Sequence, residues 1–265
     1  MLSLLFLVTS LYGRVFYVES SSRSDFNTVI EALDNTTRND TIYVSRDRCD
    51  INAVINMNGQ TLIGESPYEC TINGGYFSNE VSYYASVVGD DNDNSLDGEI
   101  INYHFDWIFG NPGHFFRDVN LTIRNCIFTQ TEVGSNLVKF SEGSSFNIYN
   151  IAYIGKELPN NWGVSRSDGI NNSNVPNSNI YNSIFTNISY LCPLPGCVVY
   201  NTILDNTSDG PYGVNCYNCL TYQLHTNWAP PDPTYDTCYN CIQEQDPLIA
   251  DYDNLDFTLL DGSPC

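Results

Sequence analysis

The chain is poor in basic residues: it has 10 Lys and Arg against 31 Asp and Glu, which gives a formal net charge of −21 at pH 7. Nucleic acids and anionic membranes are bound through clustered Lys and Arg side chains, so this composition argues against both as partners. The excess of carboxylates also repels acidic polysaccharides unless calcium bridges the two. Such an acidic surface is common in extracellular proteins, where it maintains solubility.

Several other features are missing. After residue 13 no apolar run is long enough to span a membrane, so we expect no membrane insertion. No linker rich in Pro, Gly or Ser divides residues 14–265, which predicts one domain. The three histidines lack metal-ligand spacing, and neither a phosphate-binding Gly motif nor a nucleophile–base constellation is visible.

The first 13 residues are Leu-rich and uncharged, and Val8-Thr9-Ser10 fits a small-residue cleavage site. This predicts a signal peptide over 1–13 and a secreted or cell-surface protein; the alternative is that the segment forms the first strand. Potential acceptor sequences for N-glycosylation are frequent in this Asn-rich chain, and they begin at Asn35, Asn39, Asn120, Asn171, Asn187 and Asn206.

A short phrase occurs six times: an apolar residue or Cys, then usually Tyr, then Asn, then a small or apolar residue, then another apolar residue. Its asparagines lie 17 to 32 residues apart, and they are Asn125, Asn150, Asn182, Asn201, Asn218 and Asn240. A repeat of this length with uneven loops indicates a solenoid. The apolar tracts are only a few residues long, which favours short strands over helices.

The positions two before and two after each Asn are mostly β-branched, so we expect both to point into the coil. The Asn between them then lies at a bend, where its tolerance of the left-handed conformation is needed. Stacked asparagines can also hydrogen-bond to one another.

The position before Asn is expected to point outward. After Arg124 in the first copy it is always tyrosine: Tyr149, Tyr181, Tyr200, Tyr217 and Tyr239. One interpretation is stacking that stabilises the surface of the sheet. The other is a ligand-binding platform for sugar rings or a partner surface.

Ten cysteines in an exported chain predict disulfides. The repeat places Cys216 beside Cys238 and Cys219 beside Cys241, close to disulfide distance. Zinc, suggested by the two C-x-x-C motifs, and free thiols are the alternatives. Cys49 and Cys70 are a further candidate pair.

The two ends of the chain resemble a known family. The strand at 15–18, an amphipathic helix predicted over 25–34, and the strands at 40–44 and 60–64 resemble the start of right-handed parallel β-helix proteins of the pectin-lyase-like superfamily. Residues 246–265 resemble the C-terminal cap of secreted members. The resemblance implies an all-β, right-handed parallel β-helix solenoid with a short N-terminal capping helix. The fragment at 74–79 also resembles repeats of β-helical outer-membrane adhesins.

One stretch resembles a catalytic motif. Arg166-Ser167-Asp168-Gly169-Ile170 is similar to the Asn-Thr-Asp-Gly-Ile stretch of polygalacturonases, in which the Asp is catalytic. The resemblance implies Asp168 as a catalytic carboxylate. Arg166 is a candidate by residue type for a lyase base. An inverting hydrolase needs a second carboxyl group, and the sequence does not identify one.

A calcium site is a further candidate. Asp93, Ser95 and Asp97 occupy positions 1, 3 and 5 of a pattern that resembles the first half of an EF-hand loop. Position 12 is His104 in place of a bidentate Glu, so a solvated acidic loop is the alternative.

Together these features favour a non-catalytic, adhesin-like protein that binds a glycan or protein partner. The tyrosines named above and Trp162, in the longest insertion between repeats, are the candidate contacts. The alternative is a polysaccharide lyase or glycoside hydrolase of the same superfamily. A purely structural element of a larger assembly is the third interpretation.

Overall fold

The short β-branched tracts of the repeat form strands that pair in parallel from one turn of the coil to the next. The computed structural model describes residues 13–51, 55, 57–74, 86–88, 96–107, 114–116, 119–130, 138–140, 145–155, 164–166, 178–187, 197–205, 215–222, 237–243, 245–251 and 254–264. The predicted signal peptide lies outside these residues except for Gly13. No helix in the described part is long and apolar enough to cross a membrane.

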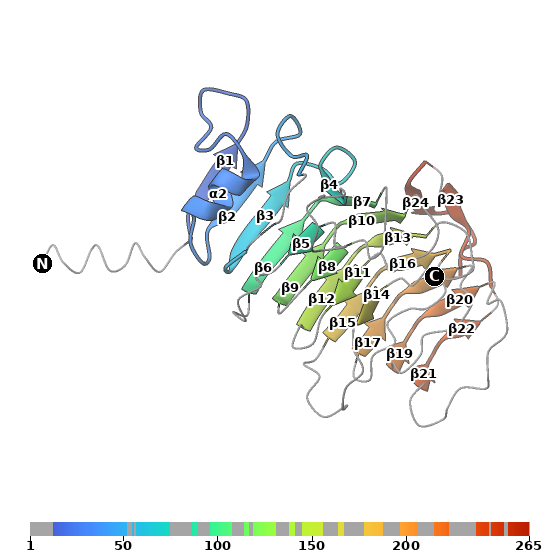
Figure 1. Ribbon diagram of the computed structural model, residues 1–265. Coiled ribbons are helices and arrows are strands. Elements are labelled where there is room, and N and C mark those ends of the chain that lie inside the picture. The colour runs from blue at the N-terminus through green and yellow to red at the C-terminus, as the bar shows by residue number, and fades with distance from the viewer. Residues whose placement is uncertain are drawn as a thin grey trace, which may run out of the picture.

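Three parallel sheets form the sides of the coil (Figure 1). Sheet A has ten strands in the order β1 (Val15–Val18), β2 (Thr41–Val44), β3 (Gln60–Gly64), β6 (Leu96–Ile101), β9 (Val119–Arg124), β12 (Ser145–Tyr149), β15 (Ser178–Tyr181), β17 (Cys197–Tyr200), β19 (Asn215–Tyr217) and β21 (Thr237–Tyr239). Sheet B has eight strands in the order β4 (Thr71–Gly74), β7 (His104–Trp107), β10 (Ile127–Gln130), β13 (Ala152–Ile154), β16 (Ile184–Thr186), β18 (Ile203–Asp205), β20 (Leu220–Tyr222) and β22 (Ile242–Gln243). Sheet C has four strands in the order β5 (Ser86–Val88), β8 (His114–Phe116), β11 (Val138–Phe140) and β14 (Val164–Arg166). A rung is one turn of the coil; the described rungs contribute up to one strand to each sheet.

The N-terminal end carries the helix α2 (Val29–Asn35). The prediction placed its start at Asp25, but Thr28 is the N-cap, and its hydroxyl accepts a hydrogen bond from the backbone N–H of Glu31. Asp25 instead accepts from the backbone N–H of Tyr17 at 2.8 Å, so it covers the outer edge of β1. The helix is thus shorter than predicted, since Asp25 pairs with a strand.

The interior is filled by side chains stacked from rung to rung. The position two before each Asn is buried as predicted: Ile123, Ile148, Ile180 and Val199 have no exposed surface. On sheet B the aromatic rings of Phe105, Phe128, Tyr153 and Phe185 are also buried and stack at centroid distances of 4.4, 6.2 and 5.5 Å. Burial of such rings is the main source of stability in this part of the coil.

The prediction that the residue two after each Asn points inward is wrong. On sheet B the residues one and three after Asn point inward, as Ser183 and Phe185 do, so the residue two after Asn lies on the outer face. This outer column, called the aliphatic column below, consists of Ile127, Ala152, Ile184, Ile203, Leu220 and Ile242. Its members are nevertheless mostly buried, because the loop at Tyr68 and the C-terminal segment cover them.

The cysteines follow the prediction in part. Cys49 and Cys70 form a disulfide, as predicted. The predicted bond from Cys216 to Cys238 is wrong: the two residues are register partners on β19 and β21, but Cys216 is a thiol. The predicted bond from Cys219 to Cys241 is wrong: Cys219 is a thiol whose sulfur contacts the carbonyl oxygen of Tyr217 at 3.4 Å. Its nearest thiol neighbour is Cys216 of the same rung, which lowers the pKa of Cys219 through a hydrogen bond.

The C-terminal segment forms a two-stranded antiparallel hairpin, β23 (Ile249–Asp251) and β24 (Asp256–Leu259). It lies along the outer face of sheet B, since Phe257 and Leu259 share cavities with the aliphatic column. A two-stranded hairpin is marginal by itself, so these apolar contacts hold it in place.

Candidate functional site

The asparagine row, Asn125, Asn150, Asn182, Asn201, Asn218 and Asn240, marks the corner between sheets A and B. All six have positive φ, between 48° and 54°, which confirms the predicted left-handed bend. Their side chains are exposed, and the amide of each donates to the amide oxygen of the preceding one at 3.1–3.3 Å from Asn150 to Asn218. The predicted asparagine ladder is therefore present over these rungs.

The tyrosine row, Tyr149, Tyr181, Tyr200, Tyr217 and Tyr239, runs beside it on the outer face of sheet A. Consecutive rings stack nearly parallel with centroids 4.8–5.1 Å apart. The two rows are linked through the backbone: the N–H of Asn201, for example, donates to the carbonyl of Tyr217 at 2.9 Å. The five rungs from Asn150 to Asn240 therefore present the same phenol beside the same amide.

The stacking determines which part of each tyrosine a ligand can reach. Both faces of Tyr181, Tyr200 and Tyr217 are covered by neighbouring rings, so the row presents ring edges and hydroxyl groups. At one end the guanidinium of Arg124, which pairs with Glu99, lies 4.2 Å from the centre of the Tyr149 ring. At the other end Tyr239 is 47% exposed, more than the half-buried tyrosines within the row.

The hydroxyl of Tyr181 is protonated at physiological pH. Burial raises the pKa of Tyr181 above its usual value, and the neighbouring Tyr149 and Tyr200 raise this pKa further by smaller amounts. A phenol both donates and accepts a hydrogen bond. The row is thus a line of hydrogen-bonding phenol groups repeated at the spacing of the rungs.

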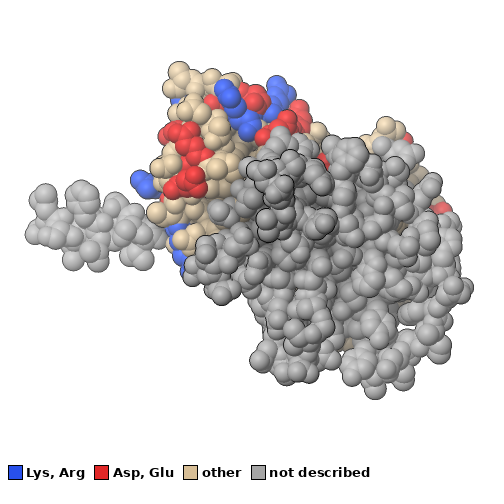
Figure 2. All heavy atoms as spheres, in the orientation of Figure 1, with Lys and Arg blue, Asp and Glu red and all other residues tan. Residues whose placement is uncertain are grey.

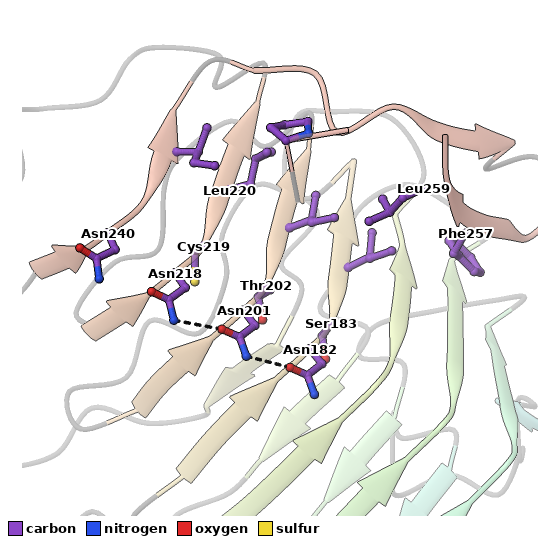
Figure 3. A pocket seen from close by; sticks show the side chains of 14 residues that line it. Asn182, Ser183, Asn201, Thr202, Asn218, Cys219, Leu220, Asn240, Phe257 and Leu259 are labelled. Atoms are coloured by element: carbon purple, nitrogen blue, oxygen red, sulfur yellow. Dashed lines mark hydrogen bonds between the residues drawn. The ribbon is translucent and has the colours of Figure 1, made fainter. Parts of the chain in front are cut away.

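A groove of about 530 Å³ lies on the other side of the asparagine row (Figure 3). One wall is formed by Asn182, Asn201, Asn218 and Asn240, and the floor by four members of the aliphatic column, Ile184, Ile203, Leu220 and Ile242. The opposite wall is the C-terminal segment, through Phe257, Leu259 and Pro264. This space is called the C-terminal groove below. None of its described lining residues is Lys, Arg, Asp, Glu or His.

The predicted catalytic and metal residues fall mostly outside the described part. Arg166 ends strand β14, where its backbone pairs with Phe140 of β11. Asp168, Trp162, Asp93 and Ser95 lie outside the described residues. Asp97 lies in β6 and its carboxylate pairs with Arg38.

Two features were missed by the sequence analysis. Asn102 also has positive φ, 60°, and its amide donates to the carbonyl of Gly64 at 3.2 Å, so the corner begins one rung earlier. The tyrosine that usually precedes Asn is replaced by Ile101 there, although Ile100 and Phe105 keep the inward pattern. The C-terminal groove was missed because the aliphatic column was assigned to the interior.

The comparisons with known proteins agree with this architecture. The solved structure of pectin methylesterase PemA from Erwinia chrysanthemi is similar to this chain with a TM-score of 0.52 and 13% sequence identity, over 89% of this chain and 93% of that one. The chain is a right-handed parallel β-helix. At this identity the similarity establishes the fold of the β-helix alone. No protein-family model and no curated protein matches the sequence.

The charge distribution of this β-helix is mixed where it is described. On the face in Figure 2, basic side chains at the N-terminal end lie among acidic ones. Arg14, Arg38, Arg46 and Arg124 each pair with a carboxylate. Pairs of this kind do not form the clustered positive surface that a polyanion requires.

Proposed function

We propose that this chain is a secreted or cell-surface β-helix protein that binds a glycan or a protein partner through the tyrosine and asparagine rows, without catalysing a reaction. The proposal depends on one observation: an exposed amide and a half-buried to exposed phenol recur side by side on successive rungs, 4.8–5.1 Å apart. An extended glycan is a polymer of similar hydroxylated units, so it can offer the same hydrogen-bonding group to each rung.

Because the rings cover one another's faces, this recognition depends on hydrogen bonds to the hydroxyl groups more than on stacking of a ligand against a ring. The phenol hydroxyls and the unused amide groups can each bond a sugar hydroxyl or a peptide group. Only Tyr239, at the end of the row, has enough exposed surface to stack on a sugar ring. Calcium between the carboxylates and an acidic glycan remains part of the proposal, although Asp97 is already paired with Arg38.

Glycan-array binding by the double variant Tyr200→Phe, Tyr217→Phe tests the proposal. The rings and their stacking remain, but two hydroxyl groups are lost, and we expect about tenfold weaker binding at roughly 0.5–1.5 kcal/mol for each hydrogen bond. Tyr43→Phe is the control, because Tyr43 lies in the same outward column of sheet A but outside the row. Binding that is equal in the double variant and the wild type would contradict the proposal.

The second candidate is a polysaccharide lyase or glycoside hydrolase. The fold similarity to a protein described as a pectin methylesterase favours it, as does the position of Arg166 at the end of β14, two residues before Asp168. A reducing-sugar and unsaturated-product assay on a polysaccharide panel, with and without calcium, tests this candidate. Turnover that is lost in Asp168→Asn would replace the first proposal.

A further inference from the structure

The asparagine row has hydrogen-bonding capacity that the fold does not use. An asparagine side chain offers two N–H groups and an oxygen with two lone pairs. Asn201 donates one N–H to Asn182 and accepts one from Asn218. The ladder therefore leaves one N–H and one lone pair on each interior amide, and these amides are exposed along one wall of the C-terminal groove.

The other surfaces of the C-terminal groove are apolar. Ser183 and Thr202, the polar residues beside the row, donate their hydroxyls to the carbonyls of Tyr181 and Tyr200 at 2.8 and 2.9 Å. Cys219 also lines the groove, and its sulfur contacts the carbonyl oxygen of Tyr217 at 3.4 Å. The other described lining residues are aliphatic except for the aromatic Phe257. A volume of about 530 Å³ with a few convergent polar groups is typical of a ligand site.

The charge of the groove restricts the class of ligand. Its described lining carries no cation, and the whole chain has a net charge of −21. An anionic ligand would gain no ion pair there and would be repelled by the overall field. A cationic ligand would gain no ion pair either, because no Asp or Glu is among the described lining residues. The groove therefore favours an uncharged occupant.

The amide wall argues against a purely apolar occupant. An acyl chain would cover the unused amide groups without bonding them, and each buried unsatisfied group costs about 1–3 kcal/mol. A peptide that adds a strand needs a free sheet edge, whereas this groove lies on the face of sheet B. A sugar chain fits both surfaces, because its hydroxyls and its C–H faces lie on different sides of each ring.

We propose that the C-terminal groove binds an uncharged oligosaccharide that runs along the coil axis, with hydroxyl groups on the asparagine row and C–H faces on the apolar lining residues that keep exposed surface, Ile184, Ile242 and Leu259. This inference rests on the proposed glycan-binding function and assigns it a ligand class and a second surface. The asparagine row is shared: it borders the tyrosine row on one side and the groove on the other.

The test is calorimetric titration of the full chain with cellohexaose and mannohexaose, together with hexagalacturonate and dodecanoate. Leu259→Glu places a carboxylate on the groove wall, and we expect at least tenfold weaker binding of the neutral hexamer. Leu260→Glu is the matched control, since Leu260 is the next residue, is more exposed at 50% against 38%, and does not line the groove. Thermal unfolding of both variants checks that the fold is retained.

The outcomes separate this inference from the proposed function. Loss of neutral-hexamer binding in Leu259→Glu but not in Leu260→Glu supports the inference. Neutral-hexamer binding that survives Leu259→Glu but weakens in Tyr200→Phe, Tyr217→Phe overturns the groove and retains the tyrosine row. Absence of hexamer binding, with long polysaccharides still bound, also overturns the groove alone. Tighter binding of dodecanoate or hexagalacturonate overturns the ligand class, and absence of all glycan binding overturns the inference together with the glycan form of the proposed function.

Discussion

At the scale of single residues, the corner between sheets A and B depends on asparagine for two separate reasons. Its backbone adopts a left-handed conformation that costs most residues about 1–2 kcal/mol, and its side chain joins the ladder. The residue after it often adds a third bond, as Thr202 does to the carbonyl of Tyr200. These local bonds explain why the repeat retains Asn where the surrounding sequence varies.

Two substitutions at Asn201 separate the backbone and side-chain contributions. Asn201→Gly keeps the left-handed backbone but loses two amide hydrogen bonds, and we expect a loss of about 1 kcal/mol in the free energy of unfolding. Asn201→Ala loses the two hydrogen bonds and also the residue type that tolerates the left-handed backbone, so it should cost about 2–3 kcal/mol. Urea unfolding followed by circular dichroism measures the two. Equal losses would mean that backbone conformation does not contribute.

A buried hydroxyl in the core is a residue where a substitution should stabilise the protein. Tyr103 has no exposed surface, and its hydroxyl oxygen has no hydrogen-bond partner in the described structure. Because an unsatisfied buried hydroxyl costs about 1–3 kcal/mol, Tyr103→Phe should raise the free energy of unfolding by about 1 kcal/mol. Tyr153→Phe, in the stack of inward rings on sheet B, is the comparison because Tyr153 is also fully buried but has further interactions. A lower melting temperature for Tyr103→Phe would show that the hydroxyl has a partner.

At the scale of elements, the N-terminal strand β1 is attached to the coil by its pairing with β2 and by one carboxylate. Asp40 accepts hydrogen bonds from the backbone N–H of Arg14 and from the backbone N–H and hydroxyl of Thr37, at 2.8–2.9 Å. Burial raises the pKa of Asp40, but these hydrogen bonds and the nearby Arg14 charge outweigh it, so the pKa lies below its usual value.

The lowered pKa of Asp40 predicts an acid-dependent contribution to stability. A carboxyl group with a lower pKa in the folded state stabilises the fold above its unfolded pKa, near 3.9, and this contribution is lost as the pH falls through the folded value. Asp40→Asn should therefore cost about 1–2 kcal/mol at pH 7, and the difference from wild type should shrink below about pH 4. The exposed Asp34→Asn on α2 is the control. Melting curves from pH 3 to 7 measure both, and a pH-independent difference would contradict the assignment.

The elements also show what the sequence can and cannot predict. Strand positions, the left-handed asparagines and the outward tyrosines follow from the repeat, because each is a local property of a few residues. The direction in which the Ile203 side chain points does not follow from the repeat. The left-handed Asn201 turns the chain, so the alternation of inward and outward side chains does not continue across the corner. The cysteines show the same limit. Register places Cys216 beside Cys238 of the next rung, but its thiol hydrogen-bonds to Cys219 of its own rung.

At the scale of the whole molecule, the two ends of the coil are built differently. The N-terminal end has the helix α2 (Figure 1). It also has the Cys49–Cys70 disulfide and the Asp25 carboxylate on the edge of β1. At the other end, β21 and β22 are the last described strands of their sheets. Burial declines there: Cys219 and Leu220 are 1% and 2% exposed, whereas Cys241 and Ile242 of the next rung are only partly buried. The sequence predicts this asymmetry only in part, because the cover over sheet B depends on contacts between distant segments.

This asymmetry predicts fraying from the C-terminal end. In a solenoid each rung is stabilised mainly by its neighbours, so a terminal rung with partial burial opens at a lower free energy than an interior one. Native-state hydrogen exchange should show the fastest exchange in β21 and β22, and slower exchange toward β12 and β13. Amides of β2, between the capped β1 and β3, should remain protected. If the groove ligand proposed above bridges the last rungs, it should slow exchange in β20 and β22 selectively, whereas a uniform change along the coil would contradict binding at that site.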